Sequence, residues 1–276
     1  MPTNQSSFDD GAQIRVSVLL PVGPNAPWLS QTLASLKLQT FSSWELVIVL
    51  DGNPVANRQK VEDAAFDVPV IVIEHETSQG IARSLNAALH RARGDLVARI
   101  DADDIAYPER LAEQVAAFDA DEELVLLGTS AIVIDSQGNS AGMDRIVPTG
   151  DAILKRRLLS RNSFIHPSVM FRRDTAVLLG GYNVHSARTE DYEFWLRLAL
   201  CGKVDNLPEP LIEYRVHQGQ HTSGKVAISR SESSALRRVK LTLAEELGTS
   251  KLSVRITHLL WIWNRSPHWY LPSKKK

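Results

Sequence analysis

The sequence of 276 residues has few of the features that mark specialised protein classes. Its single cysteine, Cys201, excludes an intrachain disulfide and a multi-cysteine metal cluster, and is typical of a reducing compartment. No apolar run reaches the roughly 18 residues of a membrane-spanning helix, and no secretion signal precedes the first apolar segment. We therefore expect a cytoplasmic protein.

A strong charge of either sign is also missing, because 31 basic and 32 acidic residues leave a formal net charge of −1. Before the C-terminal tail, no basic run is interleaved with aromatic residues, which argues against a nucleic-acid partner. No Gly-x-Gly-x-x-Gly motif follows an apolar run, so a dehydrogenase is disfavoured. The hydrophobic share of 43% is ordinary for a globular protein, and the length is sufficient for one large α/β domain.

Short apolar runs alternate with helix-like segments in the first half of the chain, after a small and polar stretch, residues 1–13, that predicts a disordered leader. Helical spacing of apolar residues follows Ser30, which can cap a helix, and Gly80. This alternation predicts a mostly parallel sheet that is buried on both faces and binds ligands at the carboxyl ends of its strands. The predicted strands are 14–20, 46–50, 68–73 and 96–100.

The pattern is looser in the second half. Pro108 predicts the start of a helix, and residues 124–134 predict a pair of strands followed by a turn at 136–139. Thr189 predicts the start of another helix. We find no internal repeat.

Three carboxylates follow the predicted strand 96–100. Residues two apart in extended backbone point to the same side, so Asp101 and Asp103 can converge on one ligand. A divalent cation such as Mg²⁺ or Mn²⁺ takes oxygen ligands of this kind. Acidic clusters before a helix can instead cap it, and Asp104 stands four residues before Pro108. These residues alone leave the two interpretations equally open.

Asp191 lies at the start of the predicted helix after Thr189, on or beside its apolar side. Such an acid can stabilise the helix N-terminus through free backbone amides and the helix dipole. It can also be a general base at the rim of a pocket. Composition alone favours the role of Asp191 as a helix cap.

Several short motifs have a characteristic order along the chain. They are Pro21-Val22, Leu38-Gln39-Thr40, Asp51-Gly52, Gly80 to Ala88, Asp101 to Asp104, His166-Pro167-Ser168, Gly180-Gly181-Tyr182 and Glu190-Asp191. In this order they resemble the bacterial family 2 glycosyltransferases, which have the GT-A fold and invert configuration at the transferred sugar. The resemblance implies a Rossmann-like α/β/α sandwich with a mostly parallel central sheet. It also implies a nucleotide-sugar-binding half (14–104), an acceptor half (105–222) and a C-terminal helical extension (223–276).

The resemblance also implies roles for individual residues. Asp191 is expected to be the catalytic base, with Glu190 and His166 in supporting positions. Asp103 and His217 are expected to hold a divalent cation, Mn²⁺ or Mg²⁺, and Asp104 to be structural. The residues expected to bind the nucleotide are Pro21, Val22, Asp51, Arg83, Asn86 and Asp101. One departure concerns the first strand: Gly23-Pro24-Asn25-Ala26 stands where the family commonly has an aromatic and a polar residue.

The function implied is transfer of a sugar from a nucleotide-diphosphate sugar, with UDP-sugars favoured, to a glycan or lipid-linked acceptor in bacterial surface polysaccharide or glycoconjugate synthesis. One alternative is a sugar-nucleotide nucleotidyltransferase, although its usual glycine-rich basic loop is absent after the first strand. The other is a non-catalytic nucleotide-sugar-binding module, against which both Asp103 and Asp191 speak.

The tail, Ser253 to Lys276, combines tryptophans with basic residues: Trp261, Trp263, Trp269, Arg255, Arg265 and Lys274 to Lys276. Indoles and cations together suit contact with an anionic membrane at the inner face of the cytoplasmic membrane. A helix packed on the domain or an oligomer contact would also account for the tryptophans.

Overall fold

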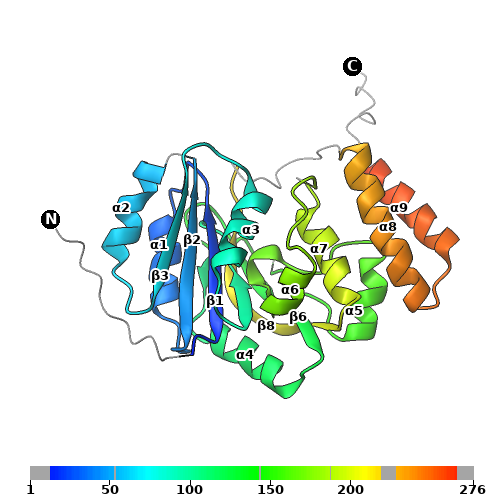
Figure 1. Ribbon diagram of the computed structural model, residues 1–276, viewed down its shortest axis with the longest axis horizontal. Coiled ribbons are helices and arrows are strands. Elements are labelled where there is room, and N and C mark those ends of the chain that lie inside the picture. Colours follow the sequence, from blue (N-terminus) through cyan, green and yellow to red (C-terminus); the bar gives the residue numbers. More distant parts are fainter. Residues whose placement is uncertain (1–12, 53, 143, 187, 219–227, 266–276) are drawn as a thin grey trace, which may run out of the picture.

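The computed structural model describes residues 13–52, 54–142, 144–186, 188–218 and 228–265. Helices cover both faces of a central sheet, and two further helices stand at the end of the molecule away from α1 and α2 (Figure 1). Nearly all of the predicted leader 1–13 lies outside the described residues, as do Trp269 and Lys274 to Lys276.

The sheet has eight strands in the order β3-β2-β1-β4-β7-β6-β8-β5. Its first half is parallel, as the alternating apolar runs predict. The strands of this half are β1 (Val16–Val22), β2 (Trp44–Asp51), β3 (Val70–His75) and β4 (Leu96–Arg99). Side chains of β1, β2 and β4 are buried on both faces almost throughout, which explains why these strands are continuous apolar runs.

Successive side chains of β1 enter two different cores, one on each face of the sheet. Val18 and Leu20 pack with the helices α1 (Leu29–Lys37), α2 (Pro54–Ala64) and α4 (Arg110–Ala120). Leu19 packs on the other face, with α3 (Ile81–Arg91) and α7 (Glu190–Ala199). The predicted three-layer α/β/α arrangement is therefore confirmed.

The second half of the sheet is mixed. Antiparallel β7 (Met170–Arg172) joins β4 to β6 (Leu124–Ile134), and β8 (Lys203–Arg215) runs parallel to β6 and pairs with β5 (Ile105–Ala106). The remaining short helices are α5 (Asp151–Leu158), a 3₁₀ turn (His166–Ser168) and α6 (Arg173–Leu178).

Two local predictions were wrong. Residues 124–134 form one strand rather than a pair, because β8 and β7 supply the pairing partners from distant parts of the chain. Ser30 does not cap α1, whose N-cap is Trp28 and has no side-chain cap. Of the two interpretations left open for the acidic cluster, a helix cap does not apply to Asp104, because β5 follows it and α4 begins only at Arg110.

The Leu38-Gln39-Thr40 motif has a structural explanation. Gln39 Nε2 donates to the Tyr107 carbonyl, its Oε1 accepts from Leu111 N, and Thr40 N donates to the Pro108 carbonyl. The segment after α1 is therefore tied to the start of α4.

The chain continues into the helices α8 (Arg230–Glu246) and α9 (Lys251–Arg265). A capping box starts α8: Ser229 Oγ accepts from Glu232 N, and the Glu232 carboxylate accepts from Ser229 N. Leu236 and Leu243 of α8 and Val254 of α9 are buried in the same core as α7. Among the described residues, no helix has the length and apolar character needed to span a bilayer.

Candidate functional site

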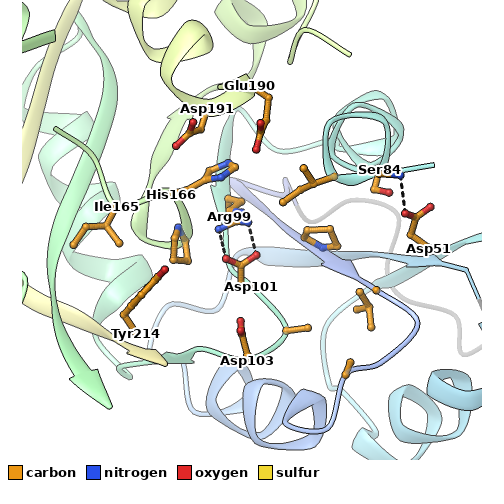
Figure 2. A pocket seen from close by; sticks show the side chains of 18 of the residues that line it. Asp51, Ser84, Arg99, Asp101, Asp103, Ile165, His166, Glu190, Asp191 and Tyr214 are labelled. Carbon is orange, nitrogen blue, oxygen red and sulfur yellow. Dashed lines mark hydrogen bonds and ion pairs between the residues drawn. The ribbon is translucent and has the colours of Figure 1, made fainter. Parts of the chain in front are cut away.

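A cavity of about 540 Å³ opens at the carboxyl ends of β1, β2 and β4. Its opposite wall includes the start of α7 and a side chain of α9. Figure 2 shows Asp101 and Asp103 on one side, Glu190 and Asp191 on the other, and His166 between them. Two groups of acids that are distant in sequence therefore face one space, at the sheet edge where the strand pattern predicts a ligand.

Asp51 organises the segment that leads into α3. One of its oxygens lies 2.9 Å from His75 Nδ1 and accepts from Gln79 N, while the other accepts from Ser78 Oγ and Gly80 N. Burial raises the pKa of Asp51, but these hydrogen bonds outweigh burial, so the pKa lies below its ordinary value. Asp51 is thus an ionised carboxylate that shapes the pocket floor.

Asp101 is held by a buried arginine of β4. The Arg99 guanidinium is 1% exposed and forms a two-pronged ion pair with the two Asp101 oxygens, Nη1 to Oδ2 at 2.7 Å and Nη2 to Oδ1. Burial disfavours the charge of Arg99, yet the carboxylates of Asp101 and Asp104 raise the pKa of the guanidinium. Bidentate pairing fixes the direction in which the Asp101 carboxylate faces the cavity.

Asp103 and His217 meet although they are far apart in the chain. His217 Nε2 lies 2.9 Å from Asp103 Oδ2, and the His217 ring packs on Trp28 with 4.5 Å between centroids. Arg215 at the end of β8 donates from Nε to the Asp103 carbonyl. The pairing of β8 therefore brings a histidine to the end of β4.

Asp104 is fully buried behind this pair. Its Oδ1 accepts from Arg215 N, and its carbonyl accepts from Thr32 Oγ1 of α1. Burial and the charges of Asp101 and Asp103 raise the pKa of Asp104 well above its ordinary value. These contacts connect β4, β8 and α1, which is a structural role.

The acidic cluster has the composition of a divalent-cation site. Ligand oxygens of Asp101, Asp103 and Asp104 lie within 4.8 Å of one another. Asp103 and the imidazole of His217 both face the cavity, whereas Asp101 is paired with Arg99 and Asp104 is buried. A carboxylate oxygen with an imidazole nitrogen fits Mn²⁺ well, and Mg²⁺ through the carboxylate.

Asp191 and Glu190 begin α7. Asp191 Oδ2 accepts from Asn162 Nδ2 at 2.7 Å, and Oδ1 lies 2.6 Å from its neighbour's backbone nitrogen, Tyr192 N. Glu190 Oε2 is buried and has no hydrogen-bond partner among the described residues. Burial, followed by the charge of Asp191, raises the pKa of Glu190 to about 8. The two adjacent acids thus differ in environment: Asp191 is positioned by an amide, and Glu190 favours the neutral form.

His166 lies between the two acidic groups. Its Nε2 is 3.3 Å from the Tyr182 hydroxyl, and its ring packs edge-on against Trp195. Burial, with a smaller contribution from Arg99, lowers the pKa of His166 well below its ordinary value. His166 is therefore a neutral imidazole that can donate or accept a hydrogen bond in the pocket.

The structure brings most of the predicted site residues to one cavity. Those that line it are Pro21, Val22, Asp51, Asp101, Asp103, His166, Glu190, Asp191 and His217. Arg83 and Asn86 are not among the lining residues: Arg83 is exposed on α3. The Asn86 side chain donates to the Tyr182 carbonyl and accepts from Tyr182 N, so it secures the Gly180-Gly181-Tyr182 turn.

The sequence alone does not assign the pocket roles of three lining residues, Arg99, Asn162 and Trp261. The role of Arg99 cannot be inferred from the sequence, because a charged residue inside an apolar run does not indicate which residue it pairs with. Asn162 lies in a loop, where its pairing with Asp191 leaves no periodic pattern. For Trp261 the sequence leaves membrane contact, packing on the domain and an oligomer contact open, and in the structure it lines the cavity and packs against Tyr192 with 5.9 Å between ring centroids.

The family of the chain is shown by sequence comparison. The sequence profile of Glycosyl transferase family 2 matches residues 17–178, more than half of the chain. The chain belongs to this family. The resemblance carried by the short motifs is thereby confirmed, and the matched region of this family 2 glycosyltransferase runs from β1 through α6 and includes the acidic cluster.

Individual relatives of the chain are glycosyltransferases by name. Amylovoran biosynthesis glycosyltransferase AmsE of Erwinia amylovora is 35% identical over 190 residues, covering 68% of this chain and 70% of the relative. O-antigen biosynthesis glycosyltransferase WbnJ of Escherichia coli is 29% identical over 227 residues, covering 80% and 87%.

Solved structures share the fold. The crystal structure of S. aureus TarS 1–349 in complex with UDP-GlcNAc has a TM-score of 0.70 at 20% identity, covering 91% of this chain and 72% of that one. The mannosyltransferase PcManGT from Pyrobaculum calidifontis, in complex with GDP-Man and Mn²⁺, has a TM-score of 0.58 at 17% identity, covering 91% and 84%. The predicted GT-A fold is confirmed by these likenesses.

Proposed function

We propose that this glycosyltransferase moves a sugar from a nucleoside-diphosphate sugar to an acceptor hydroxyl with inversion, using a divalent cation. The observation that carries the proposal is the pair of acidic groups facing one cavity, Asp101 and Asp103 after β4 and Asp191 at the start of α7. Such an arrangement has one acid for the leaving diphosphate and another for the attacking hydroxyl. The names of the relatives AmsE and WbnJ support a role in bacterial surface polysaccharide synthesis.

The donor is assigned to the strand side of the cavity. Pro21, Val22 and Asp51 line the space for the nucleoside, and Asp101, whose oxygens are fixed by Arg99, is assigned to the ribose. UDP is favoured as the nucleotide because the TarS structure named above holds UDP-GlcNAc. Contact of Arg83 with the nucleotide stays a prediction.

The cation is assigned to Asp103 and His217, whose facing atoms are 2.9 Å apart. When bound, a divalent cation stabilises the negative charge that develops on a leaving diphosphate. The PcManGT complex with Mn²⁺ supports this requirement. Arg215 secures the backbone of Asp103, and Trp28 the ring of His217, so both groups are positioned before a ligand arrives.

Asp191 is assigned as the general base. As the acceptor oxygen forms its bond to the anomeric carbon, the bond to the diphosphate breaks and the hydroxyl proton passes to Asp191. Attack from the face opposite the leaving group inverts the anomeric centre in one displacement. Asn162 holds one oxygen of Asp191, and neutral His166 and Glu190 line the same side without adding negative charge.

The acceptor side is lined by α7 and by Trp261, an aromatic face of the kind that packs against sugar rings. A glycan or lipid-linked acceptor is therefore proposed, while the cytoplasmic location and an oligomeric state stay predictions.

Calorimetric titration of UDP in Mn²⁺ and in EDTA tests the donor assignment. We expect binding that depends on Mn²⁺ in the wild type and falls at least about tenfold in Asp103→Ala, because the charge-assisted contact to the cation is lost. Asp205→Ala, an acid on β8 outside the cavity lining, is the control. Equal UDP affinity with and without Mn²⁺ would contradict the metal assignment.

A further inference from the structure

Helix α9 has two unlike faces. Val254 and His258 are buried, and Trp261, which lies on the same side of the helix, reaches the cavity. On the opposite side, large apolar side chains recur at helical spacing and are 50–66% exposed. This outer face of α9 consists of Leu252, Ile256, Leu259, Leu260 and Trp263.

The outer face is unusual for this molecule. The other exposed large apolar side chains of the described residues lie singly or as a neighbouring pair in separate parts of the chain, as Leu38, Val55 and Ile146 do. Scattered apolar side chains are ordinary on protein surfaces, whereas a contiguous apolar stripe marks a site of interaction. In Figure 1, α9 lies at the outer edge of its end of the molecule.

The charges of this segment indicate what kind of partner covers the outer face of α9. From Lys251 to Lys276 the sequence contains no acidic residue and has six basic ones: Lys251, Arg255, Arg265, Lys274, Lys275 and Lys276. Arg255 is exposed at the flank of the outer face, and Lys251 pairs with Glu245 of α8. An apolar face flanked by Arg255, on a sequence segment that has no acidic residue, complements an anionic lipid surface. A symmetric contact with a second copy would bring the same cations together.

We propose that the outer face of α9 docks on an anionic phospholipid bilayer, with the helix lying in the plane of the interface. Trp263 and the leucines would enter the boundary between headgroups and acyl chains, and Arg255 would contact the headgroups. Trp261 is on the opposite face of the same short helix and lines the cavity, so docking holds the cavity close to the membrane. That consequence, access to a lipid-linked acceptor, rests on the proposed function; docking itself does not.

Vesicle co-sedimentation of the full chain tests the proposal. We expect the wild type to pellet with vesicles of phosphatidylcholine and phosphatidylglycerol at low salt, and much less with phosphatidylcholine alone. The triple variant Leu252→Gln, Ile256→Gln, Trp263→Gln is expected to lose at least about tenfold in partitioning, because three apolar side chains no longer enter the lipid. The matched control is Leu38→Gln with Leu178→Gln, two exposed leucines on other elements, and it is expected to partition like the wild type.

Equal partitioning of the triple variant and the wild type would overturn the proposal, as would absence of wild-type binding to anionic vesicles. A dimer in light scattering that the triple variant dissociates, without vesicle binding, would assign the face to a second copy. The assay contains no donor or acceptor, and Mn²⁺-dependent UDP binding is measured on the same samples. The result for vesicle binding is therefore independent of the result for the proposed function.

Discussion

Replacement of Glu190 by glutamine changes the pH dependence of stability in a direction fixed by the structure. Burial and the neighbouring charge of Asp191 raise the pKa of Glu190 from 4.5 to about 8. A raised pKa means that the folded protein binds a proton that the unfolded chain has lost between these pH values. The stabilising effect of the neutral carboxyl is thus complete below pH 4.5 and is lost as pH rises toward 8.

At about 1.4 kcal/mol for each tenfold change in proton affinity, the rise in pKa corresponds to at most about 5 kcal/mol. Glutamine has nearly the same shape and is neutral at every pH. We expect the free energy of unfolding of Glu190→Gln to match the wild type below pH 4.5 and to exceed it increasingly up to pH 8, by several kcal/mol.

Urea denaturation at a series of pH values measures this difference. Glu209→Gln, which neutralises an exposed glutamate of β8, is the control and is expected to leave the pH dependence unchanged. If Glu190→Gln and the wild type differed by a constant amount from pH 5 to 9, the assignment of a neutral buried carboxyl beside Asp191 would be refuted.

Two further predictions concern stability. Gly181→Ala places a methyl group against Asn86 Oδ1 at a backbone angle φ of +68°, and we expect a loss of about 2 to 3 kcal/mol in urea denaturation. Gly180→Ala, with φ of +77° and open space around the new methyl, should lose only about 1 kcal/mol, and equal losses would contradict the packing argument. Ser229→Ala removes the capping box of α8 and should lose about 1 kcal/mol, which Ser229→Thr should largely restore. An unchanged unfolding midpoint in Ser229→Ala would show that the cap is dispensable.

The half of the fold that could be predicted from sequence is the half in which continuous apolar runs alternate with helix-like segments. β1, β2 and β4 are continuous apolar runs because both of their faces are buried, and each is followed by the residues that line the cavity. The pairing of β6 could not be predicted, since β7 has only three residues and β8 contains charged residues and prolines, so neither partner is a continuous apolar run.

In the site, too, residues that stand in sequence motifs could be predicted, and residues whose roles depend on tertiary contacts could not. Asp103 and Asp191 stand in recognisable motifs and do line the cavity. Arg99 and Asn162 act through single side chains whose partners are set by tertiary contacts. The direction of Trp261 depends on which side of α9 packs against α7, which the spacing of apolar residues on a helix with two apolar faces does not decide.

The general base is the part of the proposal on which transfer depends, and donor turnover by Asp191→Asn tests it most directly. The measurement is UDP release from a UDP-sugar that the wild type binds, with Mn²⁺ and with water as the surrogate acceptor. The account predicts that Asp191→Asn binds UDP with wild-type affinity while its turnover falls about 100-fold or more, because asparagine cannot take the proton. Wild-type turnover by this variant would contradict the account.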